Sequence, residues 1–487
     1  MLKFLTNESN RAYTENGALT NRTSGCFCLD LFFKAGAMRG ASELDIANAV
    51  TRAYAEDPVK TLKIVFFARD VRGGLGERRF FSVAVRTLAD IAPEAVDRNV
   101  RFFAEYGRYD DLLSLLGTSC ERAALDVIKS RLNDDLAAFE RGEPISLLAK
   151  WLPSVNTSSE QARSAAKHIA RSLKLTEKEY RQTLSKLRKY TDIIENRLRV
   201  RDYSFSYAKQ TSGAMLKYRR AFMRNDCGRY LAYLKNVQSG KETMHADTLY
   251  PYQIVRGCFD HGLTAGARLS LDTTWKSLPV FGESGNAIAV VDGSGSMYCN
   301  YYGGIRPIDA AMSLGIYFAE HNKGVFANRF ITFSSTPRLV EIKGADIVEK
   351  VRYCSTFNEI SDTNLEAVFK LILSAAIRGG VPQSELPERI YIISDMEFNS
   401  CIYGGNDLTL FAAAEKMYAR HGYRLPEIVF WNVNSRSDNI PVTMSQTGAA
   451  LVSGATPAIF DMVAGGDLSP EIVMNSVIES ERYKQIS

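Results

Sequence analysis

Apolar side chains recur every three or four positions through much of residues 40–240, and this spacing predicts consecutive amphipathic helices. Asp57 followed by Pro58 is typical of an N-cap and a first helical residue, and it predicts a helix that runs to Phe67. Residues 120–139 show the helical spacing most clearly. One face of that helix would carry Leu125, Ile128, Leu132 and Leu136.

Further along the same region, Thr176 and Glu179 form a capping box and predict a long basic helix that continues to about Val200. A glycine-rich stretch at 73–76 predicts a turn between two earlier helices. Helices joined by short turns are typical of HEAT-like repeats, whose curved surface suits an extended ligand, although no strict sequence period is present. Residues 1–280 are therefore expected to form an α-helical repeat domain.

The pattern changes near Pro279, where short apolar strands begin to alternate with helices. Ala287–Val291 and Arg389–Ser394 have the apolar, β-branched composition of buried parallel strands. The other expected elements are helix 307–320, strand 330–333, helix 364–377, helix 408–420, strand 428–433 and helix 471–478. This alternation predicts a doubly wound, Rossmann-like α/β domain over residues 281–487.

Polar residues cluster where the strands of this sheet are expected to end, which is where open α/β sheets bind ligands. They are Asp292, Ser294, Ser296, Thr363 and Asp395. Two carboxylates and three hydroxyls are hard oxygen donors, which favours Mg²⁺ or Mn²⁺, with Ca²⁺ sharing the same preference. Two negative charges are too few to enclose the ion, so we expect bound waters and one position open to a partner's carboxylate.

Other interpretations of the loop after Asp292 each lack a necessary residue. A phosphate-binding P-loop would end in Gly-Lys-Ser/Thr, but Gly295 is followed by Ser296. Neither serine has the flanking glycines of a hydrolase elbow, and Ser294 replaces the second aspartate of a haloacid dehalogenase motif. A structural alternative stays open, in which Asp292 and the serines only cap a helix.

The order Asp292-x-Ser294-x-Ser296, then Thr363, then Asp395 resembles the metal-ion-dependent adhesion site of von Willebrand factor A domains, over about residues 283–487. The resemblance implies direct coordination of the ion by Ser294, Ser296 and Thr363. It also implies that Asp292 and Asp395 act largely through bound waters.

Three stretches in the amino-terminal half resemble Ro ribonucleoprotein-type proteins, and more closely their uncharacterised relatives in bacteria, plants and large viruses. They are Glu15–Ala18, Leu29–Arg39 and Ala68–Arg79. In that family a ring of TROVE-type helical repeats precedes a von Willebrand A domain. The resemblance implies binding of small structured non-coding RNAs and of the 3′ ends of misfolded RNAs, and it identifies no individual RNA-contacting residue.

The net charge of +5 is unevenly distributed. Residues 161–240 hold 19 Lys/Arg against 6 Asp/Glu, a net of +13, whereas residues 281–487 hold 16 against 23, a net of −7. A basic region of this kind suggests a polyanionic partner, and nucleic acid is the commonest. A solvated helical surface is the alternative explanation.

Aromatic residues such as Tyr203, Phe205 and Tyr218 are interleaved with the cations of this region, and the combination is typical of RNA recognition. The same aromatics taken singly are more typical of a core. The candidate RNA-binding residues are Arg181, Lys186, Arg188, Lys189, Arg197, Arg199, Arg201, Lys209, Lys217, Arg219, Arg220 and Arg224. The Arg69–Arg79 segment is interpreted as a turn in preference to a phosphate-binding loop.

No catalytic constellation is evident, because the five histidines are scattered and Glu397 is as readily a supporting residue as a general base. We therefore expect no enzymatic activity. No apolar run reaches the length of a membrane span, the first residues lack a secretory signal, and eight cysteines are too few for a disulfide scaffold. These features predict a monomeric cytoplasmic protein without membrane contact.

Three hypotheses of function follow from the sequence. The leading one is a non-enzymatic RNA-binding protein of Ro type, whose A domain holds Mg²⁺ and recruits a protein carboxylate. The second is a metal-dependent protein-interaction module without RNA. The third, and weakest, is a metal-dependent RNA-processing enzyme, because only one metal cluster and no assigned base are visible.

Overall fold

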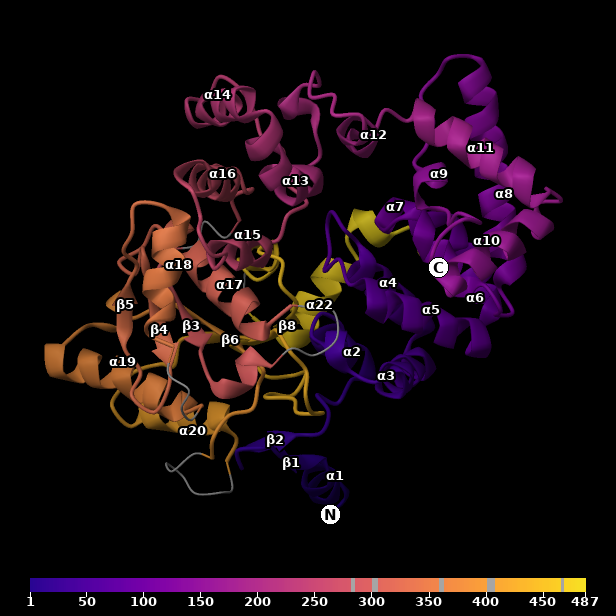
Figure 1. Ribbon diagram of the computed structural model, residues 1–487. Helices are drawn as coiled ribbons and strands as arrows, with labels where there is room; N and C mark the ends of the chain where they lie inside the picture. Colours follow the sequence, from indigo (N-terminus) through magenta and orange to yellow (C-terminus); the bar gives the residue numbers. More distant parts are fainter. Residues whose placement is uncertain (282–284, 300–304, 359–362, 401–407, 466–467) are drawn as a thin grey trace.

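A helical part precedes a part built on a parallel sheet in the computed structural model of the chain (Figure 1). The structure describes residues 1–281, 285–299, 305–358, 363–400, 408–465 and 468–487. The expected fold class, helical repeats followed by a doubly wound domain, is confirmed. Within the described ranges, no helix is long and apolar enough to cross a membrane.

The helices of the first part follow one another with short connections, as expected. They are α1 (Leu2–Asn10), α2 (Phe27–Ala35), α3 (Glu43–Glu56), α4 (Pro58–Arg69), α5 (Arg78–Ile91), α6 (Pro93–Asn99), α7 (Phe103–Tyr106), α8 (Glu121–Glu140), α9 (Leu148–Trp151), α10 (Glu160–Ser172), α11 (Glu177–Tyr190), α12 (Ile194–Arg199), α13 (Ser212–Asn225), α14 (Cys227–Gln238), α15 (Pro251–Cys258) and α16 (Ala265–Lys276). The Asp57 side chain caps α4 by accepting from the Lys60 N–H at 2.9 Å.

The long basic helix expected from Thr176 to about Val200 is wrong, because α11 ends at Tyr190 and a separate helix, α12, follows. The chain turns at Asp192, which has a positive φ of 42°. The Asn196 side chain donates to the Arg188 carbonyl at 2.7 Å and satisfies an acceptor at the end of α11. Apolar periodicity continues across the break, so it did not reveal the turn.

Residues 194–244 enclose a hydrophobic cluster of their own, separate from the main core. Its buried members are Ile194, Phe205, Tyr207, Met215, Phe222, Tyr230, Tyr233, Leu234 and Met244. Phe205 and Tyr207 are therefore core residues, and Tyr203 packs against them with partial exposure. The interleaving of aromatics with cations reflects helices that bury one face and leave the other to solvent.

The sheet of the second part has the strand order β5-β4-β3-β6-β7-β8. Its strands are β3 (Ala287–Asp292), β4 (Arg329–Phe333), β5 (Leu339–Glu341), β6 (Arg389–Ser394), β7 (Glu427–Asn432) and β8 (Ala449–Ser453). All neighbouring strands are parallel except the pair β4–β5. The order places the topological switch point between β3 and β6, where α/β sheets bind their ligands.

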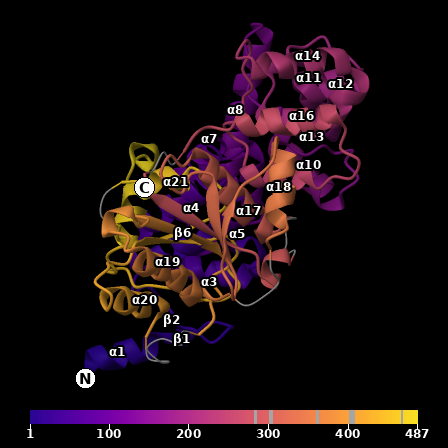
Figure 2. The ribbon, with the colours of Figure 1, turned by 90° about the vertical axis from the view of Figure 1, so that its left-hand side faces the viewer.

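Helices cover both faces of this sheet (Figures 1 and 2). On one side lie α17 (Pro307–His321) and α18 (Ile347–Ser355), and on the other lie α19 (Leu365–Gly379) and α20 (Leu410–Ala419). Two short helices follow β8, namely α21 (Ile459–Met462) and α22 (Pro470–Ile478). The sequence pattern did not reveal β5 and β8, because β5 has three residues with an exposed leucine and β8 (AALVS) contains only one β-branched residue.

The amino-terminal part contributes a helix to the sheet, because α2 packs against β8. The Gly36 N–H donates to Ser453 Oγ at 3.0 Å, and a Cβ atom on Gly36 would lie 2.6 Å from the Gly454 nitrogen. Two small strands, β1 (Arg11–Tyr13) and β2 (Leu19–Asn21), form a hairpin just before α2. The main hydrophobic core runs continuously through both parts of the chain.

The carboxyl-terminal residues return to the helical part and bind the segment after α4. Arg482 and Tyr483 both donate to the buried Asp70 carboxylate, with Tyr483 Oη at 2.9 Å from Oδ2 and Arg482 Nη2 at 2.7 Å from Oδ1. The segment Arg69–Arg79 is thus a turn that holds the carboxyl terminus, in agreement with the interpretation as a turn between helices.

We predict that Asp70→Ala lowers the free energy of unfolding by about 3 kcal/mol, since it removes the buried acceptor of an ion pair with the half-buried Arg482 and of a hydrogen bond from the buried Tyr483. Urea unfolding measures the change. Asp134→Ala on the exposed face of α8 is the matched control and should shift the value by less than about 0.5 kcal/mol. Equal effects of the two variants would contradict the role assigned to Asp70.

Candidate functional site

The carboxyl ends of β3 and β6 bring the first carboxylate of the candidate site against a serine of the neighbouring strand. The register pairs Val291 with Ile393, so Asp292 lies beside Ser394. Asp292 is fully buried, and its Oδ2 accepts from Ser394 Oγ at 2.6 Å. Its Oδ1 accepts from the Ser294 N–H at 2.9 Å, which turns the chain sharply after the strand.

The two serines of the loop lie together beyond the strand end. Ser294 Oγ and Ser296 Oγ are 3.1 Å apart, with Ser296 in the single 3₁₀ turn Gly295–Tyr298. Asn358 packs against the loop from outside, because a Cβ atom on Gly293 would lie 3.2 Å from Asn358 Cα. The loop thus presents two hydroxyl oxygens next to a buried carboxylate.

Asp395 supplies the second carboxylate at the same edge. It is 2% exposed, and among the described residues its Oδ2 accepts no hydrogen bond. Arg436 is the nearest cation, with Nη1 at 3.5 Å from that oxygen. Burial and the nearby Asp395 charge together raise the pKa of Asp292 to about 7.

Thr363, the third expected hydroxyl, lies just before α19 and is bound to the segment that follows Asp395. Its Oγ1 donates to the Glu397 carbonyl and accepts from Asn16 Nδ2 at 3.0 Å. Asn399 Oδ1 lies 3.1 Å from the same hydroxyl. The structure therefore brings Asp292, Ser294, Ser296 and Asp395 together, whereas the contacts of Thr363 are with residues 397, 399 and 16.

An amino-terminal segment, residues 14–17, lies across this edge, and we call it the N-terminal strap. The Glu15 N–H donates to Glu397 Oε2 at 2.7 Å, and Asn16 Nδ2 also donates to the Glu397 carbonyl at 2.7 Å. The Glu15 carboxylate pairs with Arg436 at 2.6 Å. Sequence reasoning missed this role, although the Glu15–Ala18 stretch stood out through its resemblance.

Glu397 holds the N-terminal strap in place through hydrogen bonds to Glu15 and Asn16. Its carboxylate accepts from Ser437 Oγ and from Asn439 Nδ2 at 3.2 Å, in addition to the Glu15 N–H. Burial raises the pKa of this carboxyl group above its ordinary value. The Glu397 carboxylate is engaged by Ser437, Asn439 and the strap. The side chain therefore supports the edge of the sheet and is not free to act as a general base.

The donors at this edge fit a hard divalent cation. The two buried carboxylates, Asp292 and Asp395, repel each other, and Asp395 Oδ2 lacks a hydrogen-bond donor among the described residues. A cation would offset the repulsion and would also bind the unsatisfied oxygen. Ser294 and Ser296 would supply hydroxyl oxygens, with Asp292 and Asp395 as the charged partners. Thr363 would join them only through the lone pair that its contacts with Glu397, Asn399 and Asn16 leave. In the part of the chain that the structure describes, no three His, Cys, Asp or Glu side chains gather around one point, so the site depends on its hydroxyls.

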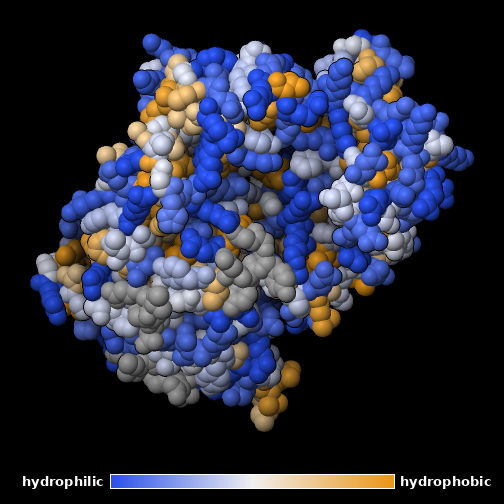
Figure 3. All heavy atoms as spheres, viewed as in Figure 1, coloured by the Kyte–Doolittle hydropathy of each residue, from blue (hydrophilic) through white to orange (hydrophobic). Residues whose placement is uncertain are grey.

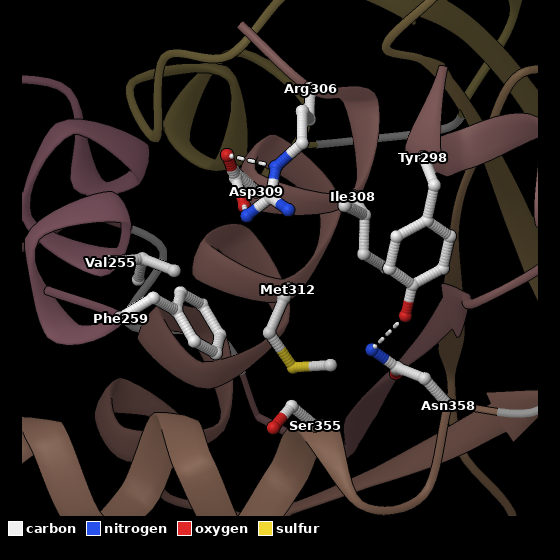
Figure 4. A pocket seen from close by; sticks show the side chains of 9 residues that line it. All are labelled: Val255, Phe259, Tyr298, Arg306, Ile308, Asp309, Met312, Ser355 and Asn358. Atoms are coloured by element: carbon white, nitrogen blue, oxygen red, sulfur yellow. Dashed lines mark hydrogen bonds and ion pairs between the residues drawn. The ribbon is translucent and has the colours of Figure 1, made fainter. Parts of the chain in front are cut away.

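An apolar pocket of about 180 Å³ opens beside residues 293–298, the loop that follows β3 (Figure 4). Tyr298 and Asn358 form one rim, joined by a hydrogen bond of 2.9 Å from Asn358 Nδ2 to Tyr298 Oη. Arg306 and Asp309 form another rim as an ion pair. Met312 lies between the two rims. A small apolar side chain of a binding partner would find a complementary surface in this pocket.

The basic stretch, residues 161–240, includes α11, α12 and α13, which lie in the upper part of Figure 1; Figure 3 shows many hydrophilic residues there, with hydrophobic ones among them. Six of the twelve candidate cations are exposed and have no partner among the described residues. They are Arg181, Lys189, Arg199, Arg201, Lys209 and Arg224. Lys186 and Lys217 are exposed and lie over the rings of Phe139 and Tyr218.

Other cations of the stretch are engaged with the protein. Arg188 donates to the carbonyls of residues 149 and 152, and Arg197 pairs with Asp192 and Asp202. Arg219 pairs with Asp260, and the exposed Arg220 shares the same carboxylate. Three guanidinium groups, those of Arg188, Arg197 and Arg219, therefore stabilise the helical part.

This geometry defines a class of protein in which a helical-repeat region is joined to a doubly wound α/β domain with carboxylates at its switch point. Residues 14–133 and 124–278 match the family described as "Domain of unknown function (DUF2828)", and the chain belongs to that family. Residues 286–483 match a second family, described as "Domain of unknown function (DUF7788)".

Similar proteins include a viral one and a bacterial one. An uncharacterised protein of Acanthamoeba polyphaga mimivirus is 26% identical over 518 residues, which cover 97% of this chain and 88% of that protein. The crystal structure of the Deinococcus radiodurans Ro (RSR) protein aligns over 93% of each chain, with 12% identity and a TM-score of 0.36. The expected likeness to an uncharacterised viral relative is confirmed.

We predict that Mg²⁺ stabilises the protein more at about pH 8 than at about pH 5.5. The folded-state pKa of Asp292, about 7, lies above its ordinary value of 3.8, so the metal-free fold is favoured when this group is protonated. That contribution is present below pH 3.8 and is lost as the pH rises through about 7. Because an ion would bind the deprotonated carboxylate, the stabilisation that it provides should grow over the same range.

Thermal unfolding with Mg²⁺ and with chelator, at both pH values, measures this difference. At a hundredfold excess over Kd the ion should add about 2.7 kcal/mol at the higher pH. Asp292→Asn should remove the effect, whereas Asp134→Asn should retain it. A gain that is the same at both pH values would contradict the assignment.

Proposed function

We propose that this chain is a non-enzymatic RNA-binding protein of Ro type. Its exposed basic stretch contacts small structured or misfolded non-coding RNA, and its strand-end site holds Mg²⁺ and receives a carboxylate from a partner. The observation that carries the RNA part is the set of six exposed cations between residues 181 and 224 that have no partner among the described residues, within a region of net charge +13.

Phosphate contact is the main interaction that this surface supports. Phe205 and Tyr207 are buried, so they offer no face to a base. Exposed lysines and arginines neutralise phosphates and release condensed counterions, which makes affinity dependent on salt and tolerant of sequence. This favours recognition of folded RNA through its backbone.

The metal site would contribute charge and an open coordination position. Ser294, Ser296 and Thr363 would hold the ion with Asp292 and Asp395, and the ion when bound would attract an acidic group. Within this chain, Asn16 and the Glu397 carbonyl orient the Thr363 hydroxyl, and Arg436 offsets part of the charge of Asp395. Glu397 is engaged by Ser437, Asn439 and the strap, so its carboxylate is not offered as a general base.

We predict that affinity for a small structured RNA falls by about 4–7 log units per tenfold increase in salt, if roughly five to eight phosphates are engaged. The triple variant Arg199→Glu, Arg201→Glu and Arg224→Glu should weaken binding and lower the salt slope by about three, one for each lost contact. Filter binding at several salt concentrations measures both quantities.

A matched control carries the same change of charge elsewhere. Lys343→Glu, Arg378→Glu and Lys416→Glu replace three exposed cations of the sheet-containing part. This control should leave the slope unchanged. A flat salt response of the unaltered protein, or equal losses in the two triple variants, would overturn the proposal.

The second candidate function is a protein-interaction module, and the apolar pocket beside the loop that follows β3 favours it. A partner that places a carboxylate on the ion could insert a neighbouring apolar side chain between Met312 and Tyr298. We predict that Asp292→Ala with Ser294→Ala abolishes Mg²⁺-dependent stabilisation and leaves the affinity for RNA within about twofold. Loss of RNA binding in this variant would show that the two sites act together.

A further inference from the structure

A cavity of about 620 Å³ lies outside both sites described above, where the turn after α4 meets the start of α15. Its volume is within the range of small-molecule sites. The residues that form the cavity and matter here are Arg39, Glu77, Arg78, Arg79, Arg86 and Tyr252. None of them belongs to the basic stretch of 161–240 or to the strand-end site.

Two segments that are distant in sequence, those of Leu75 and Tyr250, meet at the wall of this cavity. Tyr250 Oη donates to the Leu75 carbonyl at 3.1 Å and joins the last helices of the helical part to its first ones. Gly76 has a positive φ of 69°, and a Cβ atom there would lie 1.9 Å from Tyr250 Oη. Glycine is thus required at this position for the two segments to meet.

Cationic groups outnumber acidic ones on the cavity wall, with four arginines against Glu43 and Glu77. Arg39 is fixed by Glu77, and Arg78 by Asp110. Arg86 is exposed and has no partner among the described residues. Because each guanidinium carries five N–H groups and these pairs use only one or two, donors remain for an anion.

Aromatic rings form another part of the wall. Tyr250 and Tyr252 stack with their ring centroids 5.8 Å apart and their planes at 20°. The Arg39 guanidinium carbon lies 6.0 Å from the centroid of the Tyr252 ring. A planar ring bound here would find an aromatic and a guanidinium surface, and its phosphate would find arginine donors.

We propose that this cavity binds a nucleotide through its phosphate group, with Arg86 and Arg78 contacting the phosphate and Tyr252 contacting the base. The ligand is either a free nucleoside monophosphate or the phosphorylated end of an RNA, which share this chemistry. The proposal does not depend on the exposed basic stretch or on the metal site, since no residue is common to them.

Calorimetric titration of the full chain with adenosine 5′-monophosphate, adenosine and inorganic phosphate tests the ligand class. The monophosphate should bind at least about tenfold more tightly than adenosine, the value of one or more charge-assisted hydrogen bonds. A short RNA with a 5′-phosphate, compared with the same RNA with a 5′-hydroxyl, tests the other source. A phosphate preference in either pair supports the proposal, and its absence from both overturns it.

Variants locate the site. Arg86→Gln should weaken the preferred phosphate ligand about tenfold, and Tyr252→Leu should reduce the difference between the monophosphate and inorganic phosphate. Arg98→Gln, on the exposed face of α6, is the matched control and should bind normally. The triple variant at 199, 201 and 224 should also retain the phosphate preference, which separates this site from the proposed RNA surface. Equal binding by Arg86→Gln and Arg98→Gln would place the ligand elsewhere and overturn the assignment.

Discussion

Two buried carboxylates at the switch point of the sheet impose the main electrostatic constraint on this fold. Asp292 and Asp395 end adjacent parallel strands, so the register that builds the sheet also brings their charges together. Hydrogen bonds from Ser394 and from the backbone compensate Asp292. Among the described residues, one oxygen of Asp395 accepts no hydrogen bond and has an ion pair with Arg436 at 3.5 Å. A bound cation would satisfy this arrangement, and the nearby hydroxyls are chemically suited to hold one.

Segments near both ends of the chain make long-range contacts, one at the strand-end edge of the sheet and the other in the helical part. The N-terminal strap binds Glu397 and Thr363, and α2 packs against the last strand of the sheet. The carboxyl terminus returns to Asp70 in the helical part. The strap thus joins the amino-terminal hairpin to the strand-end edge, where Asn16 contacts the hydroxyl of Thr363 directly.

The sequence was most informative where burial on both sides leaves an unbroken apolar run. Strand Arg389–Ser394 was predicted with the bounds that the structure has, and the carboxylates beyond it followed from strand topology. Periodicity carried no information about the break at Asp192, which depends on local hydrogen bonds. Periodicity also could not reveal that residues 14–17 cross the sheet edge or that Arg188 binds the carbonyl of residue 149, because these contacts join segments that are distant in sequence. The ion pair of Arg197 with Asp192 is local, but it depends on side-chain geometry that the apolar pattern does not contain.

The central claim is that the strand-end carboxylates and hydroxyls hold a divalent cation. Anomalous diffraction from crystals of the protein soaked in Mn²⁺ tests it most directly. The account predicts one strong peak beyond β3 and β6, at about 2.0–2.2 Å from the nearest serine oxygens, and its loss in Asp292→Asn. A saturating soak that leaves this edge without a peak, while Mn²⁺ appears elsewhere, would contradict it.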